Sequence, residues 1–326
     1  MPIDAIEDRP FRTLPFLGNP HAQTVLGNLS SWTRDLFPST PHVVPLADGD
    51  AVVLHETTPT VDPAACCVLL LHGLGGTHRS GYLRRIANEL VGRGMRVYRI
   101  DLRGCGDSVR HARRLYNAAC SGDVRSAALW IAARNPGMPI LVAGFSLGGN
   151  IALRLAGEAA DDPVPGLAGI VSVGAPLDLA RCSAMIRDYP FYDRYYSKRL
   201  VAQVRLLGRI QRDVAIPTFP RRLTIREFDA LYTAPNGGFD GVDDYHRRAS
   251  ALPFVPAIRL PTYVLAARDD PFVAWQSYAE LPALPNLTLQ LAPRGGHLGF
   301  LGSDGRGGIR WAETQVIDWI ASRMTS

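Results

Sequence analysis

The chain has 326 residues, of which 47% are apolar and 20% are charged, and it carries a formal net charge of +5. This balance excludes a disordered chain, and the longest apolar run, residues 64–71, is far shorter than the roughly 20 residues of a membrane-spanning helix. The five cysteines form no CxxC pair, which argues against a disulfide scaffold or a zinc ribbon. Residues 1–8 are acidic without an apolar core, so we expect no signal peptide and a cytoplasmic protein.

Short apolar runs alternate along the chain with segments of helical length. The expected strands are residues 52–54, 66–71, 95–100, 140–143, 170–173, 263–266 and 287–291. The expected helices are residues 82–91, 124–133, 150–159 and 311–324. Because strands that alternate with helices of this length form βαβ units, the sequence predicts an α/β fold with a mostly parallel central sheet flanked by helices.

The alternation stops between residues 179 and 260, where helical and loop segments contain six prolines. A block inserted between late strands of such a sheet is expected to cover the carboxyl ends of the strands, where ligands bind. The sequence therefore predicts three parts. They are an N-terminal extension packed on the core (1–40), an α/β core (41–178 and 261–326) and an inserted helical cap (179–260).

The strongest motif is GFSLGG at residues 144–149, between an expected strand and an expected helix. A GxSxG sequence in this context is a nucleophile elbow, in which the serine, here Ser146, stands in a strained turn. Small residues at positions 144 and 148 let the strand and the helix approach closely. The N–H of Leu147 lies at the helix N-terminus, where it is expected to face a developing oxyanion.

A serine nucleophile needs a base, and eight histidines are available. His297 is selected because its glycine-rich loop, GGHLGF, follows the last expected strand and precedes the C-terminal helix. Two adjacent carboxylates, Asp269 and Asp270, follow the strand at 263–266. We favour Asp270 as the acid that orients the base, because this acid commonly precedes proline, and Asp269 stays open as the alternative. Asp178 is a further candidate, and its other interpretation is a helix N-cap.

A second oxyanion donor is expected from the HGLGG turn at residues 72–76, and the N–H of Leu74 is favoured. His72 is expected to hold this loop by packing instead of serving as the base. The loop at residues 101–108 is expected to form a tight turn under the site. Its Cys105 could line the pocket, but nothing in the sequence makes this thiol a nucleophile.

These motifs, with the chain order Ser146, Asp270, His297, resemble the α/β-hydrolase superfamily. Two further sequence features resemble the YheT-like branch of this superfamily, the AB hydrolase 4 group. They are the NPHAQT sequence at 19–24 and the FD, TAP, GF, Y and AS positions within 228–250. The resemblance spans about residues 10–320 and implies a serine hydrolase acting on carboxylic esters. Eukaryotic relatives include lipid and phospholipid esterases, often with an N-terminal membrane anchor, which we do not expect here.

The expected reaction is acyl transfer from an acyl or lipid-like ester. His297 takes the proton of Ser146 as it attacks the carbonyl, Asp270 holds the imidazole, and the N–H groups of Leu147 and Leu74 bind the oxyanion. Water then releases the acyl group, and no metal or organic cofactor is expected. Two alternatives stay open: transfer of the acyl group to another alcohol or thiol, and a ligand-binding protein that keeps the hydrolase fold without catalysis.

Positive charge is concentrated in one segment, which we call the basic segment. Residues 187–226 hold ten basic and three acidic side chains, a net charge of +7 that exceeds the +5 of the whole chain. The segment predicts a cationic, tyrosine-containing face toward anionic lipid or an acidic substrate, and a solvated, internally paired helical face is the alternative. Its tyrosines are Tyr189, Tyr192, Tyr195 and Tyr196. No nucleic-acid-binding motif is present, and the oligomeric state is not predicted.

Overall fold

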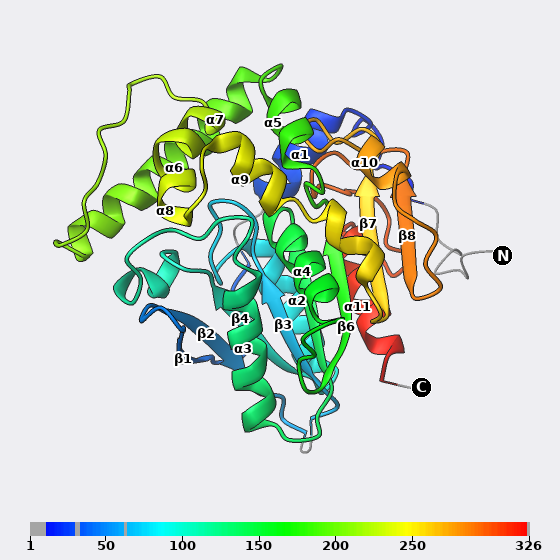
Figure 1. Cartoon of the computed structure of the whole chain (residues 1–326). Helices are drawn as coiled ribbons and strands as arrows, with labels where there is room; N and C mark the ends of the chain where they lie inside the picture. The colour runs from blue at the N-terminus through cyan, green and yellow to red at the C-terminus, as the bar shows by residue number, and fades with distance from the viewer. Residues whose placement is uncertain (1–10, 30–32, 62–63, 325–326) are drawn as a thin grey trace.

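The computed structural model describes residues 11–29, 33–61 and 64–324. Its centre is an eight-stranded sheet in the order β1-β2-β4-β3-β5-β6-β7-β8, with helices on both faces (Figure 1). The strands are β1 (Thr40–Pro45), β2 (Ala51–Thr57), β3 (Cys67–Leu71), β4 (Arg96–Asp101), β5 (Ile140–Phe145), β6 (Leu167–Val173), β7 (Thr262–Ala267) and β8 (Leu287–Ala292). Only the pairs β1–β2 and β2–β4 are antiparallel, which confirms the predicted α/β fold with a mostly parallel sheet.

Two layers of helices bury both faces of this sheet. They are α2 (Gly81–Gly92) and α11 (Trp311–Ser322) on one face, and α3 (Ser121–Arg134) and α4 (Leu147–Glu158) on the other. Neighbouring residues of β3 contribute to different cores: Leu70 packs with α2 and α11, whereas Leu69 packs with α3 and α4. Because successive strand side chains point to opposite faces, a strand covered on both sides must be apolar throughout, which explains the continuous apolar runs.

Two of the elements that are absent from the sequence prediction precede β2. The strand β1 is short, has proline near or at each end, and pairs only with β2 at the sheet edge, so its exposed residues give no apolar pattern. The helix α1 (Pro20–Leu29) lies within the predicted extension and begins at a proline. Residues 1–10, which carry the expectation of no signal peptide, lie outside the described residues.

Between β6 and β7 the chain leaves the sheet and forms a series of helices. They are α5 (Leu179–Ile186), α6 (Pro190–Ile210), α7 (Ile225–Phe228), η2 (Asp229–Thr233), α8 (Ala234–Gly237), α9 (Val242–Ala249) and η3 (Leu252–Ala257). Figure 1 shows most of them above the carboxyl ends of the strands, with α6 reaching farthest from the sheet. Val204, Leu207, Phe228 and Tyr232 are buried together in a small core of this segment. We propose on this basis that residues 179–260 form a cap.

Two short helices complete the structure, η1 (Gly106–Arg110) after β4 and α10 (Gln276–Ala279) after β7. The N-terminal helix α1 lies at the same end of the sheet as the cap (Figure 1), and its His21 contacts Tyr192 of α6. Within the described ranges, no helix combines the length and the apolar character needed to cross a bilayer.

Candidate active site

Ser146 stands in the turn between β5 and α4, at the carboxyl end of the central strand. Its backbone has φ 53° and ψ −122°, a strained conformation for a residue with a side chain. A Cβ atom at Gly144 would lie 2.1 Å from Gly148 O, and one at Gly148 would lie 2.6 Å from His72 O. Glycine is therefore required at both positions, because strand, helix and the neighbouring loop touch through their backbones there.

A continuous chain of hydrogen bonds joins the three residues predicted for catalysis. Ser146 Oγ lies 2.9 Å from His297 Nε2, and His297 Nδ1 lies 2.7 Å from Asp270 Oδ2. The other oxygen of Asp270 accepts from the backbone N–H groups of Phe272 and Val273, both at 3.0 Å. His297 and Asp270 are 2% and 5% exposed, so this geometry is held in a water-poor environment. An imidazole in this arrangement donates from Nδ1 and accepts at Nε2, where it can take the serine proton.

The two alternative carboxylates lie elsewhere. Asp269 Oδ1 accepts from the backbone N–H of Gly296 at 2.9 Å, and burial raises the pKa of the Asp269 carboxyl. Asp178 is the N-cap of α5 and accepts from the N–H of Arg181 at 3.1 Å, which matches its alternative interpretation. Neither carboxylate has a hydrogen bond to His297 in the part of the chain that the structure describes.

The loop that carries Leu74 is fixed on both sides by tyrosine hydroxyls. The N–H of Gly73 donates to Tyr82 Oη at 3.0 Å, and the N–H of Gly75 donates to Tyr116 Oη at 2.8 Å. Leu74 N lies between these two bonds and has no hydrogen-bond partner among the described residues, and the same is true of Leu147 N. Since buried backbone donors are rarely left unpaired, these two N–H groups are free for a ligand.

This loop also lies directly against the serine, since a Cβ atom at Gly73 would be 2.9 Å from Ser146 Cβ. Tyr82 and Tyr116, which hold it, are missing from the sequence prediction. Each is a single tyrosine without a motif around it, and only the fold brings the two to the loop. No sequence signal identifies them.

His72 holds the loop from beneath, as expected. Its Nε2 accepts from the N–H of Leu102 at 3.2 Å, its Nδ1 donates to Gly73 O at 2.8 Å, and burial lowers its pKa. Cys105 is fully buried, and burial raises the pKa of its thiol well above the usual value. It lines neither of the two cavities at Ser146, so the suggestion that Cys105 could line the pocket is wrong.

Two cavities meet at Ser146 and His297, and we call them the larger and the smaller lobe. The larger lobe, of about 480 Å³, is bordered by the glycine-rich loop at 73–76, by tyrosines of α6 and by arginines. The smaller lobe, of about 120 Å³, extends under the cap and is lined mostly by apolar side chains, among them Leu179, Ile186 and Phe228. A substrate at Ser146 could thus place one part of its structure on each side of the serine.

The helix α1 holds the loop of His297 in place. Thr24 Oγ1 accepts from the backbone N–H of His297 at 2.8 Å. The side chain of Gln23 donates to Leu301 O at 3.1 Å and accepts from Leu301 N at 2.6 Å. A Cβ atom at Gly299 would lie 2.4 Å from Gln23 O, so the two segments are in backbone contact. The NPHAQT motif is the sequence signal for these residues, although the motif by itself indicates no role.

The four tyrosines of the basic segment do not share one exposed face, and the orientation of the segment toward anionic lipid or an acidic substrate stays a prediction. Tyr192 is 7% exposed and its ring lies 5.2 Å from that of Phe272, and Tyr196 is 5.8 Å from the same ring. Tyr192 Oη also lies 3.2 Å from His21 Nδ1 in α1. Only Tyr195, at 46%, is clearly exposed. The tyrosines of α6 therefore border the cavity, and the outer face of the helix carries the charges.

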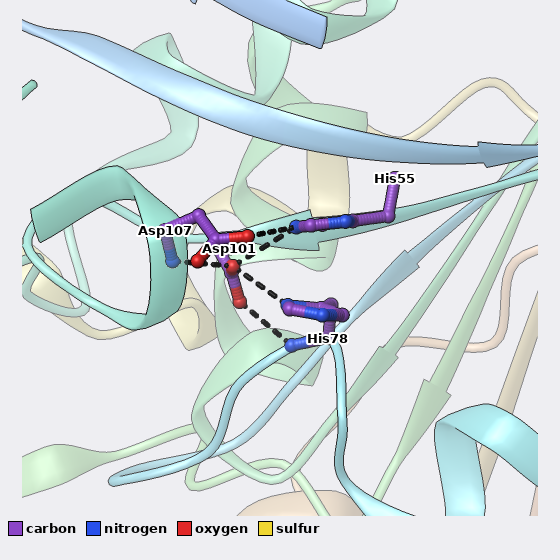
Figure 2. Close-up of side chains that lie close together, drawn as sticks. All are labelled: His55, His78, Asp101 and Asp107. Atoms are coloured by element: carbon purple, nitrogen blue, oxygen red, sulfur yellow. Dashed lines mark hydrogen bonds and ion pairs between the residues drawn. The ribbon is translucent and has the colours of Figure 1, made fainter. Parts of the chain in front are cut away.

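A second cluster of titratable side chains lies at the end of β4. Figure 2 shows His55 and His78 stacked on one another, with both rings directed at Asp101. Asp101 Oδ2 accepts from His55 Nε2 at 3.1 Å, from His78 Nδ1 at 2.7 Å and from the N–H of Asp107 at 2.8 Å. Burial alone would raise the pKa of Asp101, but the hydrogen bonds from the two histidines outweigh burial and hold it well below its usual range.

Among the described residues, the side chains of one group have possible metal-donor atoms close enough together to bind a single ion. They are His55, His78, Asp101 and Asp107. Histidine nitrogens and carboxylates are suitable transition-metal ligands. The ring centroids of His55 and His78 are only 3.4 Å apart, and the angle between the two ring planes is 16°. A metal ion about 2.1 Å from one nitrogen of each ring would therefore lie far outside both ring planes. The arrangement fits a hydrogen-bonded network better, in which Asp101 joins β2, β4 and the loop after β3.

Comparison with known proteins identifies the family. A family model described as the alpha/beta hydrolase fold matches residues 67–304. The chain is 31% identical over 317 residues to "Putative esterase YheT" of Escherichia coli (strain K12), covering 93% of this chain and 91% of that protein. It is 30% identical over 262 residues to "Monoacylglycerol lipase" of Saccharomyces cerevisiae (strain ATCC 204508 / S288c), covering 77% and 58%.

Among solved structures, the esterase Pf2001 of Pyrococcus furiosus matches with a TM-score of 0.62 at 16% identity, covering 89% of this chain and 92% of that one. An esterase of Pyrobaculum calidifontis matches with a TM-score of 0.58 at 19% identity, covering 94% and 91%. These likenesses show the fold, and the sequence matches show the family. The chain therefore belongs to the α/β-hydrolase family and to its YheT-like branch.

Proposed function

We propose that the protein is a serine hydrolase that cleaves carboxylic esters. The observation that carries this proposal is the hydrogen-bonded chain from Ser146 through His297 to Asp270, at the point where the two lobes meet. The names of the relatives, an esterase and a monoacylglycerol lipase, support the same reaction class.

In the first half of the reaction, Ser146 Oγ attacks the ester carbonyl carbon while His297 Nε2 takes its proton. The carbonyl π electrons move to oxygen, and the N–H groups of Leu74 and Leu147 donate to this oxyanion. Asp270 stabilises the imidazolium across the 2.7 Å bond to Nδ1. When the tetrahedral intermediate collapses, the C–O bond to the alcohol breaks, and His297 gives the proton to the leaving oxygen.

In the second half, water attacks the acyl-serine ester and His297 again serves as the base. The carboxylic acid is released and the proton returns to Ser146. Because oxyanion donors of this kind act only as charge develops, we expect each of the two backbone N–H groups to contribute about 10²–10³ in rate.

The two lobes have different linings, which supports an orientation for the substrate. The smaller lobe is lined by apolar side chains of the core and the cap and suits the acyl chain. The larger lobe is open to the glycine-rich loop and to polar groups of α6 and suits the alcohol portion. In this orientation the ester carbonyl lies between the N–H groups of Leu74 and Leu147.

The proposal is tested with p-nitrophenyl acetate and with a fluorophosphonate probe, whose phosphorus is attacked by an activated serine with loss of fluoride. We expect hydrolysis and labelling by the wild type, and loss of both in Ser146→Ala. Ser126→Ala is the matched control, because Ser126 lies on α3 and its hydroxyl bonds, within the described part of the chain, to Gly122 O alone. A wild-type protein that is folded but resists the probe and cleaves no ester would refute the proposal and leave ligand binding without catalysis.

The same assay separates hydrolysis from acyl transfer. Product analysis in the presence of ethanol or a thiol measures how the acyl group divides between water and the competing acceptor. A carboxylic acid as the main product supports the hydrolase. An ester or thioester as the main product at low acceptor concentration would identify an acyltransferase instead.

The basic segment supports a further part of the proposal, contact with an anionic lipid surface. Nine of its ten basic side chains are exposed. Among the described residues, Arg226 is the only one of the ten that forms an ion pair, and its partner is Asp243. Of its three acidic residues, Asp213 is paired with Arg113 outside the segment, Asp193 is buried and accepts from Ile225 N, and Asp188 is exposed, so the segment keeps a large positive charge. We expect co-sedimentation with vesicles that contain anionic lipid and little with neutral vesicles, and equal binding to both would refute it.

A further inference from the structure

The larger lobe differs in charge from the rest of the site. Of the described residues that line it, three are arginines and none is an aspartate or glutamate. One of them, Arg85, is held in a bidentate ion pair by Glu313, with Nε–oxygen distances of 3.0 and 2.8 Å. The positive charge that remains for a ligand belongs to Arg79 and Arg199.

Arg199 reaches the glycine-rich loop from the cap. It projects from α6, and its Nη2 donates to Gly75 O at 2.7 Å while its Nη1 donates to Tyr195 Oη at 3.1 Å. No carboxylate lies within ion-pair distance of this guanidinium in residues 11–29, 33–61 and 64–324. The two bonds position the guanidinium beside the loop of Leu74 without neutralising its charge.

Arg79 reaches the same lobe from the core. Its Nε donates to His78 Nε2 at 3.2 Å, and His78 Nδ1 in turn donates to Asp101 Oδ2 (Figure 2). The bond from His78 Nδ1 to Asp101 fixes the imidazole tautomer in which Nε2 accepts from Arg79. The structure describes no carboxylate paired with Arg79, and the two terminal nitrogens of its exposed side chain remain available as donors.

Both guanidinium groups line the cavity that contains Ser146, and for Arg199 the chain also limits the distance to the serine. Gly73 is in contact with the serine, and two residues of chain span at most about 8 Å, so Gly75 and the Arg199 group bonded to it lie no farther than roughly 10–12 Å from the reacting carbon. This separation matches an alcohol portion of three or four carbons with a charged end. A neutral alcohol would leave both charges without a partner.

We propose that Arg79 and Arg199 form an anion subsite that binds a carboxylate or phosphate on the alcohol portion of the substrate. The inference rests on the proposed ester hydrolysis and narrows its substrate class to esters of anionic alcohols. Guanidinium groups suit either anion, because their paired N–H donors match two oxygens of one carboxylate or phosphate.

The test compares three butyryl esters that share the acyl group: 1-butyrylglycerol, which is neutral, 1-butyrylglycerol 3-phosphate, and 3-butyrylglycerate, whose alcohol carries a carboxylate. Release of butyrate gives kcat/KM for each. We expect at least one anionic ester to exceed the neutral ester by about tenfold or more at low salt, mainly through KM, with a smaller ratio at 0.5 M NaCl. Comparison of the two anionic esters distinguishes phosphate from carboxylate as the natural group.

Two variants and a matched control assign the effect to the subsite. In Arg79→Gln and in Arg199→Gln the ratio of anionic to neutral kcat/KM is expected to fall about tenfold. Arg110→Gln removes an exposed arginine that lines neither lobe, and its ratio should equal that of the wild type. A wild-type ratio at or below one, or a ratio that both subsite variants leave unchanged, would overturn the inference while ester hydrolysis stands.

A binding measurement covers the case in which none of these esters is cleaved. Glycerol 3-phosphate or glycerate should slow fluorophosphonate labelling of Ser146 in the wild type at millimolar concentration, and glycerol should not. This protection should be lost in Arg199→Gln. Equal protection by glycerol refutes the subsite, whereas failure of Ser146 to be labelled at all refutes the proposed function and, with it, this inference.

Discussion

The contact between α1 and the loop of His297 leads to a sharp prediction for Thr24→Val. Valine has nearly the same shape as threonine, so the substitution removes the hydroxyl and leaves the packing. The oxygen of the lost hydroxyl accepts from the backbone N–H of His297 at 2.8 Å. The same hydroxyl donates its own proton to Pro20 O within α1. His297 is 2% exposed, so its N–H has little access to water as a replacement partner.

The size of the effect follows from this burial. An unpaired buried donor costs about 1–3 kcal/mol, and the loop can avoid part of that cost by moving His297 away from Ser146. If this movement of His297 accounts for about 1.4 kcal/mol, the fraction of molecules in which His297 is aligned with Ser146 falls tenfold. We therefore expect kcat to fall about tenfold with a smaller change in KM, and the thermal midpoint to fall by only a few °C.

The assay is p-nitrophenyl ester hydrolysis at 25 °C, with circular dichroism to show that both proteins are folded. Thr24→Ser is the matched control, because serine keeps the hydroxyl and should retain activity within about threefold. Two results would refute the reasoning. One is a valine variant with the kcat of the wild type, and the other is a serine variant as slow as the valine variant.

Three further predictions concern the acid, the acid stability of the fold and the acyl chain. Asp270→Asn should lower kcat by about 10³–10⁴ because it disturbs the tautomer of His297. Asp269→Asn keeps an amide oxygen that can accept from Gly296 N–H and should lower kcat less than about tenfold, and a reversed order in steady-state kinetics would exchange the two assignments. The lowered pKa of Asp101 means that its contribution to the free energy of unfolding is complete above about pH 5 and is lost as the pH falls below its unfolded pKa of about 3.9. In urea titrations, the stability difference between wild type and Asp101→Asn should accordingly shrink from pH 7 to pH 3, and a difference that grows in acid contradicts the network. The smaller lobe, at about 120 Å³, should favour p-nitrophenyl butyrate over the palmitate ester by at least about tenfold in kcat/KM, and equal values would exclude this lobe as the acyl site.

Most of the fold could be predicted because its strands are covered on both faces. Leu69 and Leu70 pack into different cores, and the resulting continuous apolar run is visible in the sequence. The edge strand β1 has the opposite environment, since it pairs with one neighbour and exposes most of its residues, and it leaves no such pattern.

The same contrast applies to the site. Ser146, His297 and Asp270 follow strands at predictable positions, because the carboxyl ends of parallel strands meet at one edge of the sheet. Tyr82 and Tyr116 reach the glycine-rich loop from helices and loops whose positions depend on the whole fold. Their role is set by tertiary contacts, which no local pattern records.

The bond between Gln23 and Leu301 has a consequence for biosynthesis. The two residues are 278 positions apart, so at 5–20 residues per second the ribosome needs roughly 15–55 s to supply the partner of Gln23. During this time α1 has no loop to hold, and the nascent chain lacks its base. The hydrogen-bonded arrangement of Ser146, Asp270 and His297, with its support from α1, can therefore form only after synthesis has passed residue 301.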